Sequence, residues 1–304
     1  MGVLELEDRL PLRIITFNIR YATTSPTPHE ELWDVRWPKL LTQLRFSTAG
    51  HSAFISLQEA LARQVDDVQT GLGRSWAHIG VGRDDGEAAG EFSPVFYHVE
   101  TWRCERSKTY WLSPTPEKPS RGWLYADNQD GRDAALPRIV TMGQFRHRLT
   151  GARVVVLSTH FDHQGVKARE ESARLILKLA DSWVGEIEGP GRARPPVFLG
   201  GDFNSTPEDR AYQTMTAPRV GMTDISTLIP EDKRYGNELT YSSFNEPDQV
   251  PKRIDFLFVK DTSAIRFLTF GVLANQFDDG VFLSDHRAVI ADIEIPVKGQ
   301  LPTL

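Results

Sequence analysis

The 304-residue sequence predicts an α/β fold in which two β-sheets pack against each other and helices cover their outer faces. Apolar runs typical of buried strands alternate with segments of helical periodicity. Several strand runs are apolar on both sides, so both faces of their sheets should be covered. Neither a repeat of 20–50 residues nor a long linker divides the chain, and we therefore expect a single domain over residues 1–304.

The first quarter of the chain predicts two strands that are each followed by a helix. In the second helix, apolar residues recur every three or four positions and Gly73 ends the pattern. These elements are the strands 12–21 and 53–60 and the helices 33–46 and 61–72.

The middle of the chain, residues 76–157, predicts short strands joined by turns, with a hairpin turn at Thr150-Gly151. The clearest amphipathic helix follows over residues 167–183, where Glu170 and Arg174 form an i,i+4 pair. The remaining predicted elements are the strands 196–202, 253–259, 267–273 and 286–295 and a helix near 207–216.

Composition and charge narrow the classes of function. The net charge is -6, and lysine and arginine are scattered, which argues against a protein that holds duplex nucleic acid by many phosphate contacts. Neither a signal peptide nor an apolar run of roughly 18 residues is evident, so we expect no membrane partner. The single cysteine, Cys104, excludes an internal disulfide and fits a cytoplasmic location.

The segment VFLGGDFNSTP, residues 197–207, ends a predicted buried strand on an acid and an amide. Residues i and i+2 of an extended segment point to the same side, so Asp202 and Asn204 should face one point just past the strand. Gly200 and Gly201 should allow another group to approach the backbone closely. An ordinary turn capped by an Asx side chain explains the same residues equally well.

Six strand termini carry polar or ionisable side chains in this way. Each one alone has an ordinary structural explanation, such as an internal hydrogen bond or a cap. Together they indicate a common site, since ligand sites form at strand ends and isolated buried polar groups are costly. The residues are Asn18, Glu59, His160, Asp202 with Asn204, Asp255, and Ser284 with Asp285 and His286.

In this order, the segments TFNIRY, LQEA, STHFDH, GGDFNSTP, RIDFLFV and LSDHRAVIADI resemble the endonuclease/exonuclease/phosphatase superfamily over residues 12–295. This group includes deoxyribonucleases, abasic-site endonucleases, inositol polyphosphate 5-phosphatases, neutral sphingomyelinases and deadenylases. The resemblance implies a four-layer αββα sandwich, in which helices flank two packed mixed sheets and the site lies at one end. It also implies hydrolysis of a phosphate ester with a divalent metal.

The resemblance implies a role for each strand-end residue. Glu59 would bind Mg²⁺ or Mn²⁺, which favour hard carboxylate ligands. Asn18 would lie beside it and contact the metal or the substrate phosphate, and Asp285 would contribute to the metal shell directly or through water.

Asp202 and Asn204 would hold and polarise the attacking water, and His160 would donate to a phosphate oxygen. Asp255 would orient His286. Whether Asp202 or His286 takes the proton from water stays open, as does the number of metals.

Four further residues are candidates for substrate binding. Arg20 stands where some nuclease relatives have an acid, and it could clamp a phosphate or form a surface ion pair. Arg83 in segment 80–97, together with Asp162 and His163, resembles loops of a mostly uncharacterised microbial branch; solvated loops are the alternative. Segment 110–116 also resembles a loop of this microbial branch.

The sequence therefore favours a metal-dependent phosphatase or phosphodiesterase that acts on a small phosphorylated substrate. A nuclease acting on DNA or RNA is the first alternative, and a non-catalytic binding module with the same fold is the second. The oligomeric state stays open.

Overall fold

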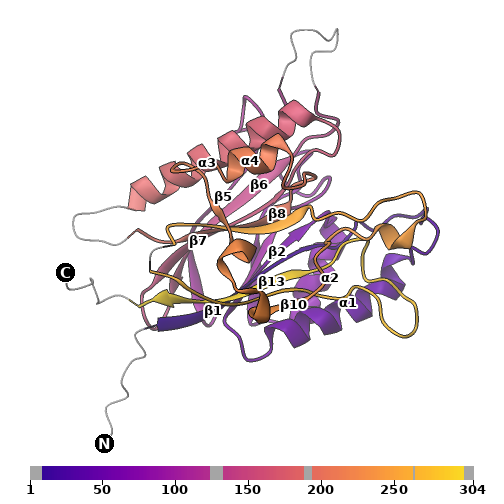
Figure 1. Cartoon of the computed structure of the whole chain (residues 1–304), viewed down its shortest axis with the longest axis horizontal. Coiled ribbons are helices and arrows are strands. Elements are labelled where there is room, and N and C mark those ends of the chain that lie inside the picture. The colour runs from indigo at the N-terminus through magenta and orange to yellow at the C-terminus, as the bar shows by residue number, and fades with distance from the viewer. Residues whose placement is uncertain (1–8, 124–132, 188–193, 263, 298–304) are drawn as a thin grey trace, which may run out of the picture.

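The computed structural model describes residues 9–123, 133–187, 194–262 and 264–297. Two β-sheets lie face to face, and helices cover the outer face of each (Figure 1). The predicted four-layer αββα sandwich with mixed sheets is confirmed.

The first sheet has seven strands, and its centre is formed by strands from the two ends of the chain. β1 pairs with β2 in parallel and with β13 in antiparallel orientation. The strands in spatial order are β10 (Arg234–Gly236), β12 (Arg266–Val272), β13 (Val289–Pro296), β1 (Arg9–Asn18), β2 (Ala53–Gln58), β4 (Val95–His98) and β3 (Trp76–Ile79).

The second sheet has six strands, and its centre is equally mixed. β7 and β8 are parallel, whereas β11 runs antiparallel to β8. The strands in spatial order are β5 (Trp102–Trp111), β6 (Ile139–His147), β7 (Arg153–His160), β8 (Val197–Asp202), β11 (Asp255–Lys260) and β9 (Thr223–Asp224).

Four α-helices in the described residues form the two outer layers. α1 (Trp33–Thr48) and α2 (Ala62–Leu72) cover the seven-stranded sheet, whereas α3 (Val166–Ile187) and α4 (Arg210–Met215) cover the six-stranded sheet (Figure 1). Short 3-10 helices occur at Ile225–Leu228, Glu231–Lys233 and Ser243–Asn245. No helix in the described ranges is long and apolar enough to cross a membrane.

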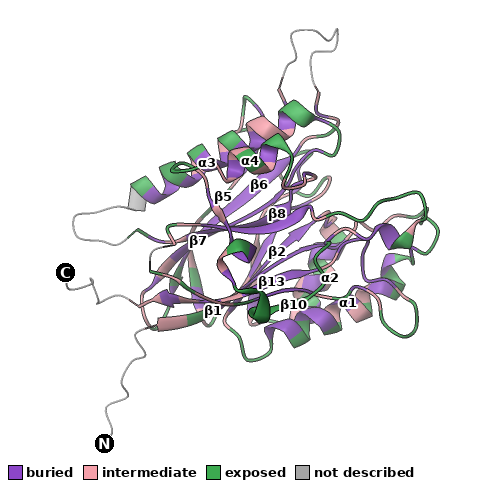
Figure 2. Cartoon of the chain, viewed as in Figure 1, coloured by how far each residue is buried: buried purple, intermediate pink, exposed green. Residues whose placement is uncertain are grey.

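Three apolar cores correspond to the three interfaces between layers. The middle core joins side chains of both sheets, such as Phe54, Val156 and Leu257, and each of the other two lies under one pair of helices. Both sheets are therefore buried on both faces, while the outward sides of the helices are exposed (Figure 2). This arrangement explains why the central strand segments are apolar throughout.

Between the sheets, the apolar core gives way to buried polar groups near the ends of β2 and β8. A side chain at Gly200 would lie 2.9 Å from the Cβ of Thr16 and 3.1 Å from the Cβ of Ser56. The group that approaches this glycine is thus the facing sheet. Glycine is needed because a Cβ at this position would crowd Thr16 and Ser56 of the facing sheet.

Most predicted elements agree with the structure to within a few residues. The helix predicted near 207–216 is only six residues long, and β9 and β10, with two and three residues, were not predicted. Tyr110 and Trp111, which were predicted in a loop, form the end of β5.

Candidate functional site

The polar residues at the strand ends meet at one end of the paired sheets. β1 and β2 are parallel, as are β7 and β8, so their carboxyl ends lie at the same edge. β11 and β13 run in the opposite direction, and their first residues therefore come to that edge. His160 pairs with Asp202, and Asp202 pairs with Asp255, across three neighbouring strands.

Asn18 is fully buried and connects the two sheets. Its Nδ2 donates to Glu59 Oε1 at 2.9 Å and to Asp202 Oδ2 at 3.0 Å. Its Oδ1 accepts from the backbone N–H of Arg20 at 3.0 Å. One carboxamide therefore fixes the relative positions of two acids that come from different sheets.

His286 forms a buried pair with Asp255. The distance from His286 Nδ1 to Asp255 Oδ2 is 2.8 Å, and the distance from its Nε2 to Asp202 Oδ2 is 3.6 Å. Burial lowers the pKa of His286, but the negative charges of Asp255 and Asp202 outweigh it and raise the pKa well above 6.5. Asp255 thus holds one nitrogen of the imidazole while the other faces Asp202.

Asp202 and Asn204 do lie together, but through a turn rather than through strand pleating. Asn204 has a φ of 45°, and its backbone N–H donates to Asp202 Oδ1 at 2.8 Å. Its Nδ2 donates to the carbonyl of Phe161 and lies 3.0 Å from His160 Nε2. The Asx-type turn and the shared polar site are therefore the same feature.

His160 is buried between Asp202 and Glu91. Burial, and then the positive charges of Arg138 and Arg83, lower its pKa well below 6.5, so the imidazole is neutral. Because Nε2 faces the Asn204 amide donor, the proton belongs on Nδ1, which lies 3.7 Å from Glu91 Oε2. In this arrangement Nε2 accepts a hydrogen bond from Asn204, and the predicted hydrogen bond from His160 to a phosphate oxygen stays a prediction.

Left-handed backbone occurs directly after three of the strands that form the site. Arg20, Glu59 and Asn204 have φ values of 57°, 59° and 45°. Such conformations are unfavourable for residues other than glycine and concentrate at functional sites.

Two groups of residues could each hold a metal ion. Ligand atoms of Glu59, His160 and Asp202 lie within 4.8 Å of one another, and so do those of Asp202, Asp255 and His286. Asp285, which was predicted as a metal ligand beside Glu59 and Asn18, belongs to neither group.

The charges at these residues suit a divalent cation. Burial raises the pKa of Glu59, but the charge of Arg20 and the hydrogen bond from Asn18 outweigh it, so Glu59 is ionised. Burial, and then the charge of Asp255, raise the pKa of Asp202 to about 7. A divalent cation would offset this crowded negative charge, and oxygen donors are the ligands that Mg²⁺ and Mn²⁺ prefer. The residues present therefore fit such a metal.

Arg20 forms an ion pair and also borders the site. Its Nε donates to the buried carboxylate of Glu30 at 3.0 Å, and its Nη1 lies 3.9 Å from Glu59 Oε2. The side chain is 20% exposed, so part of the guanidinium faces solvent. The predicted ion pair is found, and the predicted phosphate contact stays a prediction.

Arg83 and His163 belong to a cluster beyond His160. Arg83 Nη1 donates to Glu91 Oε2 at 2.6 Å. Arg138, which sequence reasoning missed, lies 3.5 Å from the same oxygen and 3.3 Å from His163 Nδ1.

Asp162 has a different environment from these residues. Its carboxylate accepts from four backbone N–H groups, those of Ala135, Leu136, Gln164 and Gly165. It therefore connects the loop before β6 to the loop after β7, which positions its neighbours.

Arg36 is a second residue that sequence reasoning missed. It lies on α1, is fully buried, and donates to the carbonyls of Ile19, Arg20 and Leu283. Burial lowers its pKa to about 10. Arg36 thus joins the segment after Asn18 to the segment before Asp285.

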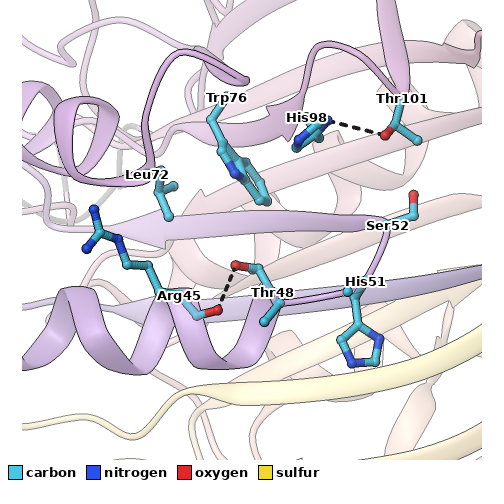
Figure 3. Close-up of a pocket in the computed structure, with 10 residues that line it drawn as sticks. Arg45, Thr48, His51, Ser52, Leu72, Trp76, His98 and Thr101 are labelled. Atoms are coloured by element: carbon cyan, nitrogen blue, oxygen red, sulfur yellow. Dashed lines mark hydrogen bonds between the residues drawn. The ribbon is translucent and has the colours of Figure 1, made fainter.

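A hollow of about 410 Å³ lies at the opposite end of β2 from these residues (Figure 3). Its lining includes Arg45, Ser52, Trp76 and His98. Arg45 donates to the carbonyl of Gly71, and Ser52 accepts from Trp102, so these polar groups have partners in the fold. The hollow is separate from the strand-end site.

The fold is the αββα sandwich of the endonuclease/exonuclease/phosphatase superfamily of phosphoesterases. The sequence profile of the Endonuclease/Exonuclease/phosphatase family matches residues 15–286, and the chain belongs to this family. Members of the family are hydrolases of phosphate esters and depend on a metal. A sequence search among curated proteins finds no significant match.

Solved structures with the same fold cover nearly the whole chain. A family protein from Bacteroides vulgatus is 31% identical, with a TM-score of 0.80, over 94% of this chain and 99% of its own. A Bacteroides thetaiotaomicron protein described as a mannosyl-6-phosphatase is 28% identical, with a TM-score of 0.76, over 93% and 99%. TDP2 from D. rerio, in complex with a single-strand DNA product, is 15% identical, with a TM-score of 0.66, over 93% and 98%. The last likeness concerns the fold alone.

Proposed function

We propose that this protein is a divalent-metal-dependent hydrolase that acts on a small phosphorylated substrate. The observation that carries the proposal is the Asn18 carboxamide, which joins Glu59 to Asp202 and lies 3.4 Å from His286 Nε2. Acids that could bind a metal and an imidazole that could move a proton are thereby held around one point.

Glu59 and Asn18 are the proposed metal-binding residues of the seven-stranded sheet, with Asp285 behind them and Asp202 opposite. The bound metal would neutralise charge on the phosphoryl oxygens and lower the pKa of a water molecule. Ser284 supports this part of the site, since its hydroxyl donates to the carbonyl of Asn18 and lies 3.2 Å from Asp285 Oδ1.

Asp202 and Asn204 are the proposed residues that orient the attacking water. The Asn204 amide nitrogen is held by Phe161 and His160, which leaves its Oδ1 to accept from that water. The proton from water goes to the Asp202–His286 pair, and Asp255 fixes the His286 tautomer.

Two observations support a small substrate over a nucleic acid. The chain has a net charge of -6, whereas a protein that binds a long polyanion usually presents many cations. The mannosyl-6-phosphatase is 28% identical over 93% of this chain, which makes a phosphorylated sugar a reasonable first substrate to test.

The test is hydrolysis of a panel of phosphate esters by metal-stripped protein, with and without added Mg²⁺ or Mn²⁺. We expect metal-dependent turnover of small esters that changes little with salt. A nuclease would instead cleave DNA or RNA efficiently and lose roughly a thousandfold in affinity between low and physiological salt. That second result would overturn the proposed substrate class.

A further inference from the structure

A cluster of charged residues lies beside Nδ1 of His160. Arg83 and Arg138, here called the arginine pair, share one oxygen of Glu91, with Nη1 atoms at 2.6 and 3.5 Å. The same oxygen lies 3.7 Å from Nδ1 of His160. His160 thus contacts this cluster through Nδ1, while its Nε2 lies 3.4 Å from Asp202 Oδ2.

In the described part of the chain, the arginine pair has a single carboxylate within hydrogen-bond distance, that of Glu91. Arg83 and Arg138 are only 7% and 5% exposed, and among the described residues Glu91, whose side chain is 16% exposed, is the carboxylate that lies within 3.5 Å of both. The other acid near Arg83, Asp84, is 51% exposed and 3.8 Å away, which makes it a weak partner. Burying two guanidinium groups around one carboxylate is costly, and a further anion at this place would offset part of that cost.

Several buried nitrogen atoms in the cluster have no hydrogen-bond partner in the protein. Among the described residues, the buried side-chain atoms without a protein partner include Nε of Arg83, Nε of Arg138 and Nδ1 of His160. Most buried N–H groups in proteins have an acceptor. Three orphaned donors within one cluster indicate an environment built for an oxygen-rich anion.

The backbone around the arginine pair is firmly held. The carbonyl of Arg83 accepts from Trp111 Nε1 at 2.7 Å, and its N–H donates to the carbonyl of Glu91. On the other side, Asp162 fixes the loop that leads into Arg138. Such preorganisation lowers the entropic cost of binding a ligand.

We propose that Arg83 and Arg138 form an oxyanion subsite beside His160 that binds an anionic oxygen group of the substrate. The proposal rests on the proposed function and extends it to a substrate class: a phosphate monoester or a molecule with a second anionic group. Guanidinium groups suit this task because their fork of N–H donors matches phosphate and carboxylate oxygens. His163 Nδ1 lies 3.3 Å from Arg138 at the exposed edge of the subsite.

The experiment compares Arg138→Met with wild type, with Arg153→Met as the matched control. Arg153 pairs with Glu105 at the start of β7, at the opposite end of that strand from His160. Inorganic phosphate is the binding probe, measured by calorimetry on the metal-loaded protein. The hydrolysis substrates are p-nitrophenyl phosphate, bis(p-nitrophenyl) phosphate and fructose 1,6-bisphosphate.

We expect Arg138→Met to weaken inorganic phosphate binding by about 10- to 100-fold, as loss of a charge-assisted contact predicts. Arg138→Lys should restore part of this loss, and Arg153→Met should have no effect. A loss in kcat/KM for p-nitrophenyl phosphate, with the diester little changed, would assign the subsite to terminal oxygens of the scissile phosphate. A loss confined to the bisphosphate would assign it to a second anionic group.

Unchanged phosphate binding in both Arg138→Met and Arg83→Met would overturn the subsite, and so would an equal loss on all three substrates. Thermal unfolding of each variant identifies one that fails to fold, in which case the other variant and Arg138→Lys decide. If wild type hydrolyses no ester at all, the proposed function fails. Phosphate binding by the variants still tests the subsite in that case.

Discussion

The buried pair of Asp255 and His286 gives the sharpest prediction about catalysis. Asp255→Asn keeps the shape of the side chain but removes the charge that faces His286 Nδ1 at 2.8 Å. Removing this charge lowers the pKa of His286, which Asp255 and Asp202 otherwise hold well above 6.5. When the new amide donates to Nδ1, the resulting neutral imidazole carries its proton on Nε2. That nitrogen is the one facing Asp202, at 3.6 Å.

The expected loss follows because Nε2, once the neutral imidazole carries its proton there, can no longer accept the proton that water releases. A proton transfer made by a positioned side chain contributes about 10²–10⁴-fold to the rate, and an imidazole in the wrong tautomer forfeits most of it. We therefore expect both Asp255→Asn and His286→Ala to lower kcat by about 10²–10⁴-fold. The fold should persist, because Asp255→Asn also removes a negative charge beside Asp202.

The assay is a double-mutant cycle on one phosphate ester at saturating metal. If the two residues act as a unit, the double variant should be about as slow as His286→Ala alone. Asp292→Asn makes the same substitution far from the site and serves as the control. Losses that multiply in the double variant would refute the reasoning.

Three further perturbations test other parts of the structure. Arg36→Met should lower activity by about 10- to 100-fold more than Gln43→Met, which is a buried change on the same helix. The reason is that Arg36 positions two segments of the site. Equal effects of the two variants on activity at equal loss of stability would contradict this. Asp292→Asn removes a carboxylate whose pKa lies below 3.8. Burial raises this pKa, but the hydrogen bonds from Arg13 and Thr269 outweigh burial and lower it. The variant should lose about 1 kcal/mol of unfolding free energy above pH 5, and the difference should vanish as the pH falls below 4; a constant difference in denaturant melts would argue otherwise. Arg20→Ala should raise KM for small esters by about 10- to 100-fold, and unchanged steady-state kinetics would remove Arg20 from substrate binding.

Sequence reasoning could predict that the polar strand ends meet, because ligand sites form at strand ends and isolated buried polar groups are costly. Parallel strands bring their carboxyl ends to the same edge, so His160 and Asp202 on neighbouring strands could be expected to lie together. A carboxylate or amide directly after an apolar run was the visible signal. The sandwich architecture followed from strands that are apolar on both faces.

The residues that sequence reasoning missed act through tertiary contacts that have no local pattern. Arg36 lies on a helix, where an arginine ordinarily belongs to the solvated face, yet its partners are carbonyls from segments far apart in the chain. Arg138 and Glu91 meet only because β4 and β6 belong to different sheets that converge near His160. The left-handed conformation of Asn204 was equally hidden, since asparagine occurs in many turn types.

The most direct test of the account compares ester hydrolysis by metal-stripped wild type and Glu59→Gln as Mg²⁺ or Mn²⁺ is added back. Glu59 is ionised and is joined to Asp202 through Asn18. We predict that the metal restores activity to wild type, and that Glu59→Gln stays folded but binds the metal weakly by calorimetry and remains nearly inactive. Full activity without a divalent metal, or unchanged metal binding and turnover in Glu59→Gln, would contradict the account.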